Sequence, residues 1–183
     1  MQAPTGQLDT PTLQSWLRDG TLAGQWVLDP ARSSIRLRST VIGLIPVSGE
    51  FREITGAGTV GPDGTVSGIL TVAAASIDTR NPRRDTHLAS ADFLGSDDYP
   101  DITFTAAGVR PAGPGATVTG ALTVRGQTRP LSVDVAVSVR GDGEIQLDTG
   151  ARVNRADFGL TWNVLGLASL HSTLTVHAVF TRP

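Results

Sequence analysis

The sequence predicts an all-β protein: one closed antiparallel barrel of about eight strands, with short helical insertions and an N-terminal helix. Two observations predict this fold class. From Gln25 onward, apolar and polar residues alternate in runs rich in Val, Ile, Thr and Leu, and Gly and Pro separate the runs. The chain has 183 residues, which suits one domain with a single core.

The first expected element is a short helix in an arm formed by residues 1–24. Thr10 is the predicted N-cap, Pro11 takes the first helical position, and Gly20 ends the helix. We expect the helix to pack on the barrel domain, which comprises residues 25–183. Its apolar face is made by Leu13, Trp16 and Leu17.

The strands follow the arm. Within each run the apolar residues recur at every second position, which indicates one buried and one solvated face. Residues 131–137 show the pattern, with apolar side chains at every odd position. The predicted strands are residues 34–40, 45–51, 65–72, 102–109, 116–124, 131–139, 144–153 and 170–180.

Turn residues lie between neighbouring runs, at residues 62–64, 113–115, 126–127 and 141–143. Sequential hairpins predict an antiparallel meander. Closure into a barrel removes the two exposed edges and leaves an interior wide enough for side chains or one small ligand. A β-sandwich is the structural alternative.

Two segments lack strand alternation, residues 78–101 and 155–168. Each is too long for a hairpin turn, and loops of this length are usually functional. Both are predicted to form a lid or mouth of the barrel.

Motifs in these segments and in the strands resemble the YceI-like family of lipocalin-like polyisoprenoid-binding proteins. The resemblance runs from about Trp26 to the C-terminus. It rests on Trp26, Leu28, Asp29, Pro30, Ser34 and Ile35; on Val47, Gly49, Glu50 and Phe51; on Asp78, Thr79, Asn81, Arg84, Asp85, His87, Leu88, Asp92, Phe93, Leu94, Tyr99, Pro100, Ile102 and Phe104; on Gly120, Leu122, Thr123, Val124, Arg125, Gly126, Thr128 and Pro130; and on Asn154, Arg155, Asp157, Phe158 and Gly159.

The resemblance implies a lipocalin-like barrel with a long apolar cavity for an isoprenoid or fatty-acid-like chain, often in a homodimer. The chain departs from the family where many members carry histidines on the first two strands, since it has Ser33 and the apolar residues 41–43 there. The N-terminal helix is also additional to the family pattern.

Charge and composition exclude several partners. The formal net charge is -2 and the basic residues are scattered, so nucleic acid is not expected as a partner. No apolar run reaches the length of a membrane span. Asp9, Arg18 and Asp19 stand where a signal peptide would be apolar, which predicts a cytoplasmic location. The absence of cysteine excludes disulfides and thiolate chemistry.

The densest polar cluster is Arg83, Arg84, Asp85 and His87. A cation at a cavity mouth could hold a phosphate, carboxylate or quinone oxygen through charge-assisted hydrogen bonds. The alternative is structural: a capped helix start with an internal arginine–aspartate ion pair that ties the loop to the barrel.

Other motifs do not predict chemistry. His171 and His177 lie on one strand face but roughly 20 Å apart, too far to share a metal ion. Gly56, Gly58 and Gly61 satisfy a dinucleotide-binding pattern, but turn residues and another strand follow them, which indicates a hairpin. We therefore expect no metal and no cofactor.

The leading hypothesis is non-catalytic binding of an extended apolar ligand, an isoprenoid, quinone or fatty-acyl chain. Small inward residues such as Gly68 and Gly120 favour an open interior. One alternative is a cavity enzyme, a cyclase or isomerase, using Asp85, Asp157 or His87. Another is a filled barrel that serves as an interaction module. The side chains predicted to contact the ligand are Phe51, Leu70, Arg84, Phe93, Phe104, Leu122, Phe158 and Trp162.

Overall fold

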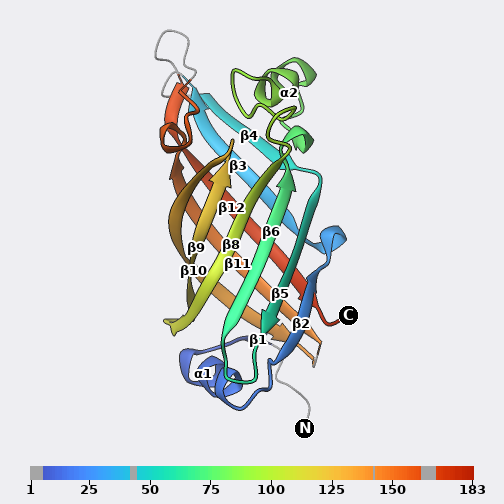
Figure 1. Cartoon of the computed structure of the whole chain (residues 1–183), viewed down its shortest axis with the longest axis vertical. Coiled ribbons are helices and arrows are strands. Elements are labelled where there is room, and N and C mark those ends of the chain that lie inside the picture. The colour runs from blue at the N-terminus through green and yellow to red at the C-terminus, as the bar shows by residue number, and fades with distance from the viewer. Residues whose placement is uncertain (1–5, 42–44, 142, 162–167) are drawn as a thin grey trace.

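One antiparallel sheet closes on itself and forms the body of the protein (Figure 1). The computed structural model describes residues 6–41, 45–141, 143–161 and 168–183. The strands are β1 (Gly6–Gln7), β2 (Gly24–Leu28), β3 (Ser34–Val41), β4 (Ile45–Phe51), β5 (Ile54–Val60), β6 (Val66–Ala73), β7 (Ile77–Asp78), β8 (Asp101–Ala112), β9 (Gly115–Val124), β10 (Gln127–Arg140), β11 (Glu144–Asn154) and β12 (Ala168–Thr181).

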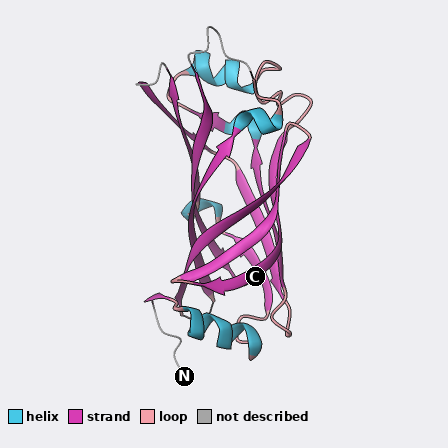
Figure 2. Ribbon diagram, turned by 90° about the vertical axis from the view of Figure 1, so that its left-hand side faces the viewer, coloured by secondary structure: helices cyan, strands magenta, loops and turns pink. Residues whose placement is uncertain are grey.

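Closure follows from the strand order. The strands pair antiparallel as β10-β9-β8-β6-β5-β2-β12, and β11 pairs with both β12 and β10. Eight strands therefore form a ring without an open edge, as the sequence predicts, and the sandwich alternative is wrong. The helices α1 (Thr10–Arg18) and α2 (Pro82–Ala89) lie at opposite ends of the barrel, called here the lower and upper ends (Figures 1 and 2).

Each of the eight predicted strands is present, but the two-residue strands β1 and β7 and the longer strands β2 and β5 are not predicted by the sequence. Both β2 and β3 pair with β12, since Phe180 is opposite Leu28 and Val176 is opposite Ile35. A 3-10 turn, η1 (Pro30–Arg32), bends the chain between them. The β5–β6 hairpin confirms the hairpin interpretation of the glycine pattern, and Gly64 has the φ of +82° that its turn requires.

Pairing between β10 and β11 is confined to their lower parts. The register runs from Arg140 opposite Glu144 to Val135 opposite Thr149, although β11 continues to Asn154. Beyond this point the 3-10 helix η3 (Arg155–Phe158) lies against β10 and β12. An irregular segment thus completes the wall near the upper end.

Helix α1 caps the lower end. Its N-cap is Asp9, whose side chain accepts a hydrogen bond from the Thr12 amide at 2.9 Å, so the prediction of Thr10 as N-cap is wrong by one residue. Gly20 follows the helix with a φ of +76°, as expected of a helix end. Leu13 and Leu17 are buried, which confirms that the helix packs on the barrel.

The buried core residues form three clusters, which partly buried side chains link: Leu147 and Phe180 pack against two of them, and Leu94 and Ile102 pack against another two. One lies at the lower end around α1 and Trp26, one beside β3 and β4, and one around Phe158 and Leu122. Among the described residues, no helix combines the length and apolar character that crossing a membrane requires.

Candidate ligand-binding cavity

A cavity of about 390 Å³ occupies the interior of the barrel. Its lining is almost wholly apolar and draws on barrel strands, α1, the α2 segment and η3. A cavity of this size is within the range of natural ligand sites. The filled-barrel alternative, which requires no continuous cavity, is therefore not supported.

Alternate side chains of the barrel strands form the walls of the cavity. On β12 the lining side chains are at even positions from Ser172 to Phe180. At about 3.3 Å per residue these positions span roughly 26 Å along the strand, so the cavity is elongated. His171 and His177 are at odd positions, and the His177 Nδ1 lies 2.6 Å from the Asp148 carboxylate, away from this lining.

Apolar side chains close the lower end. Leu13 and Leu17 of α1 line the cavity with Leu22 and Trp26. The Trp26 indole donates a hydrogen bond to the Leu22 carbonyl at 3.0 Å, and the Arg182 guanidinium lies 4.8 Å from its ring. The polar edge of Trp26 is thereby satisfied while its rings face the cavity.

Helix α2 and the segment that follows it cover part of the upper end. Leu88, Phe93 and Leu94 line the cavity there. The Arg125 Nη1 donates a hydrogen bond to the Phe93 carbonyl at 3.0 Å, which ties this segment to the β9–β10 turn. The prediction that the long 78–101 segment lies at the barrel mouth agrees with this placement.

The helix η3 contributes the other part of the upper end. Asn154 caps it by accepting a hydrogen bond from the Ala156 amide at 3.1 Å, and Gly159 ends it with a φ of +73°. Between these two caps, Arg155 and Phe158 are buried and line the cavity. Burial lowers the pKa of the Arg155 guanidinium, because a low-polarity surrounding disfavours the charged form.

Most of the predicted ligand-contacting residues line this cavity. They are Phe51, Leu70, Phe93, Phe104, Leu122 and Phe158. Trp162 lies outside the described residues. Arg84 is not among the lining residues, and its side chain is bound to Thr79.

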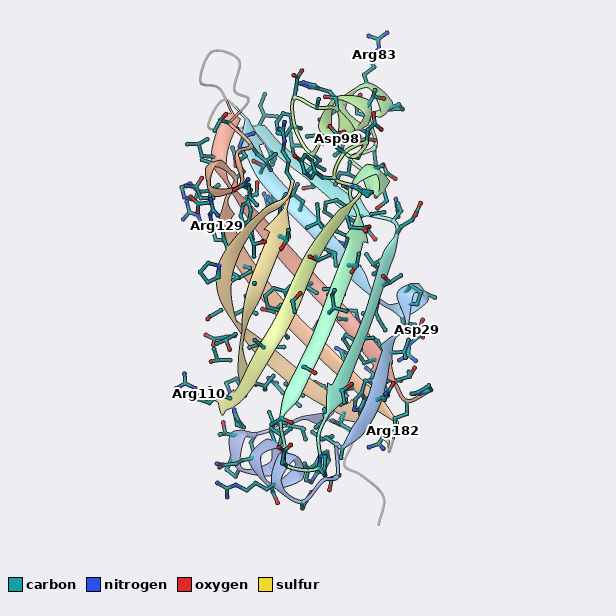
Figure 3. All side chains as sticks on the ribbon, viewed as in Figure 1. Asp29, Arg83, Asp98, Arg110, Arg129 and Arg182 are labelled. Atoms are coloured by element: carbon teal, nitrogen blue, oxygen red, sulfur yellow. The ribbon has the colours of Figure 1, made fainter. Side chains whose placement is uncertain are left out.

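Arg84 and Asp85 have a structural role instead. The Arg84 side chain donates hydrogen bonds to the hydroxyl and carbonyl oxygens of Thr79, at 2.7 and 2.8 Å. The Asp85 carboxylate accepts from the Thr79 amide and hydroxyl. Thr79 is buried, so both residues tie α2 to the chain beside β4. Arg83 points away from the barrel (Figure 3).

The predicted general acids and bases lie away from the cavity. Asp85 is bound to Thr79, Asp157 is exposed, and His87 packs edge-on against the Phe93 ring at 5.5 Å between ring centres. None of these three residues lines the cavity. The geometry therefore offers no support for the cavity-enzyme alternative in the form proposed from the sequence.

Gly68 and Gly120, the two glycines predicted to leave the barrel interior open, differ in their effect on the cavity. Gly68 lines the cavity, as expected. At Gly120, a β-carbon would lie 2.3 Å from the Thr105 carbonyl oxygen and 2.8 Å from the Phe104 ring. Gly120 is thus required by the close approach of the Thr105 backbone and the Phe104 ring, and it is not among the residues that line the cavity.

Two contributors were missed by sequence reasoning, Arg155 and the leucines of α1. A sequence signal exists for Arg155, since it follows a capping asparagine and precedes a Phe–Gly pair. Leu13 and Leu17 were expected to pack on the barrel but not to face its cavity.

Fold and cavity together define a class of protein: closed antiparallel barrels with an elongated apolar interior. The family model described as YceI-like domain matches residues 26–180. The chain therefore belongs to the YceI-like family. Helix α1 precedes the matched residues.

Relatives agree with this assignment. Protein YceI of Escherichia coli O17:K52:H18 is 40% identical over 73 residues, covering 40% of this chain and 38% of the relative. Protein YceI of Salmonella arizonae is 31% identical over 112 residues, covering 58% of each chain. The matches thus span 38% and 58% of these relatives, less than two thirds of either.

Solved structures share the fold. Burkholderia cenocepacia BcnA has a TM-score of 0.76 at 24% identity, over 83% of this chain and 98% of BcnA. A polyisoprenoid binding domain from Saccharophagus degradans has a TM-score of 0.73 at 14% identity, over 86% of this chain and 98% of that domain.

Proposed function

We propose that the protein binds one extended apolar molecule inside the barrel and carries it without chemical change. The ligand classes that fit are isoprenoid, quinone and fatty-acyl chains. The observation that carries the proposal is the elongated apolar cavity of about 390 Å³. Burial of apolar surface contributes about 25 cal/mol per Å², so a chain that fills such a cavity gains much of its affinity without specific polar contacts.

Two further observations support the proposal. The Saccharophagus degradans domain with the same fold is described as polyisoprenoid binding. The acids and bases considered from the sequence, Asp85, Asp157 and His87, are not among the cavity-lining residues. A carrier role requires apolar lining and access, whereas a cyclase or isomerase requires a positioned acid or base.

Native mass spectrometry of the purified protein, followed by solvent extraction, tests the proposal. We expect a bound lipid of defined mass, or uptake of one equivalent of offered geranylgeraniol or hexadecanoic acid. The molecule should be recovered unchanged. Repeated absence of both a co-purified lipid and uptake would contradict binding, and recovery of a converted product would contradict the carrier role.

A further inference from the structure

Part of the cavity wall at the lower end comes from the N-terminal arm, which precedes the residues that the family model matches. Leu13, Leu17 and Leu22 line the cavity and are buried, with exposed fractions of 3%, 8% and 5%. Leu13 and Leu17 are one helical turn apart on α1, so they lie on the same face of the helix. This face of α1 therefore forms the floor of the cavity.

The barrel strands hold α1 in place from several sides. Before the helix, β1 pairs with β10. In its first turn, the Thr10 hydroxyl donates a hydrogen bond to the Gly113 carbonyl in the β8–β9 turn. In its last turn, the Leu17 carbonyl lies so close to the β5–β6 turn that a β-carbon at Gly64 would be 2.9 Å from its oxygen. The helix is thus fixed across the end of the barrel.

The chain that follows the helix is fixed as well. The Arg182 Nη2, just beyond β12, donates a hydrogen bond to the Thr21 carbonyl at 2.8 Å. The Leu22 carbonyl accepts the hydrogen bond from the Trp26 indole on β2 at 3.0 Å. Because these contacts tie the arm to β12 and β2, the floor has a defined height inside the barrel.

The depth of the cavity above this floor limits how much of a chain can be buried. On β12 the lining side chains run from Ser172, toward the upper end, to Phe180, which packs with the buried cluster around α1. These positions span roughly 26 Å along the strand and roughly 20 Å along the barrel axis, because barrel strands are tilted by about 40°. Each methylene that leaves water strengthens binding about fourfold. A chain that reaches α1 can bury no more of them without displacing Leu13 or Leu17.

We propose that Leu13 and Leu17 determine the longest apolar chain that the cavity accepts. The end of the bound chain contacts these two side chains, so the N-terminal arm selects ligands by length. This inference rests on the proposed function and deepens it, because it specifies which residues limit the length of the ligand.

The test measures dissociation constants for saturated straight-chain acids of increasing length, from dodecanoic to docosanoic acid, below the concentrations at which they aggregate. Leu13→Ala lowers the floor of the cavity and Leu13→Phe raises it. Gln14→Ala and Gln14→Phe are the matched controls, since Gln14 is the next residue of α1 and is exposed. Thermal unfolding of each variant verifies that it is folded at the temperature of the binding measurement.

For the unmodified protein, affinity should rise with chain length up to a limiting length and then rise no further. Leu13→Ala should move this limit about two carbons toward longer acids, because it removes most of the leucine side chain. The first acid beyond the former limit should then bind about tenfold more tightly than it binds to the unmodified protein. Leu13→Phe should move the limit toward shorter acids, and the two Gln14 variants should leave it unchanged.

Opposite shifts in the two Leu13 variants distinguish length selection from a merely structural role, which would weaken the binding of all acids equally. One limiting length shared by the Leu13 variants and the controls would overturn the role of α1 and leave apolar binding intact. An affinity that rises through the whole series in the unmodified protein would do the same.

Leu17→Ala replaces any Leu13 variant that does not fold. It should move the limit toward longer acids, and an unchanged limit in this variant would equally contradict the proposal. Failure of the unmodified protein to bind any of the acids, or to take up geranylgeraniol, would overturn the proposed function itself.

Discussion

At the scale of single residues, Asp78 anchors the start of the segment that covers the upper end. Its carboxylate accepts hydrogen bonds from the Arg52 Nε and Nη2, at 3.1 and 2.8 Å, and from the Arg80 amide at 2.7 Å. Arg80 has a φ of +62°, which a residue with a side chain rarely adopts. The Asp78 carboxylate therefore stabilises an unfavourable backbone conformation just before α2.

This anchor predicts a pH dependence of stability. The hydrogen bond from Arg52, then that from the Arg80 amide, holds the pKa of Asp78 below its usual value of 3.8. A depressed folded pKa means that the ionised carboxylate stabilises the fold above the unfolded pKa, and that this stability is lost as pH falls through the folded pKa. Asp78→Asn should thus lower the free energy of unfolding at neutral pH, and the difference should shrink below about pH 4.

Urea denaturation of both proteins across this pH range measures the effect. Asp97→Asn, at an exposed position near the same end, is the control and should change stability little at any pH. A difference for Asp78→Asn that stays constant down to pH values well below about 3 would contradict the account.

Alternation in the sequence predicts which strand side chains point inward, but it does not predict which arginine lines the cavity. Alternation correctly indicated Leu70, Phe104 and Leu122 as inward, since a strand side chain has only two directions. The direction of an arginine in an irregular segment depends on caps and turns instead. Arg84 turns back to Thr79, whereas Arg155 enters the cavity.

At the scale of elements, α1 determines where the cavity ends. Its two buried leucines face the interior, and its Thr10 hydroxyl donates a hydrogen bond to the Gly113 carbonyl in the β8–β9 turn. The helix therefore closes the lower end and sets the maximum length of a bound chain.

Leu13→Ala tests this closure. Loss of a buried leucine side chain should lower the free energy of unfolding by about 2–5 kcal/mol. Gln14→Ala, at the next and exposed position, should have little effect, since alanine favours a helix. Chemical denaturation checks both, and equal stabilities of the two variants would show that α1 does not pack into the barrel end.

Elements with strong alternation or clear turn residues could be predicted from the sequence, whereas β2 and β5 could not. The β5 segment contains Gly56 and Gly58, which have no side chains to show alternation, and β2 is only five residues long. Their identity depends on partners distant in the sequence, such as Gly58 opposite Trp26. The Asp9 cap was missed because Thr10 beside it is also a favourable cap residue.

At the scale of the whole molecule, a closed ring of strands surrounds an elongated cavity. The leucines of α1 line its lower end, and Arg155 lines its upper end. Closure could be predicted because sequential hairpins leave two edges that a barrel removes. The end of the β10–β11 pairing at Val135 could not be predicted from the sequence, because strand register is decided by contacts between distant residues. That register is what places η3, and with it Arg155, at the upper end.

We expect an apolar chain to lie inside this barrel, and a bulky side chain placed on the cavity wall tests this directly. Val118 lines the cavity from β9, whereas the next residue, Thr119, is exposed on the outer face. The measurement is the uptake of hexadecanoic acid and geranylgeraniol by Val118→Trp and Thr119→Trp, with the thermal unfolding of each variant as a check of folding.

We expect Val118→Trp to remain folded and to lose at least about tenfold in affinity for both chains, because the indole occupies their path. Thr119→Trp should bind as the unmodified protein does. Unchanged binding by a folded Val118→Trp, or equal loss in both variants, would contradict an internal site.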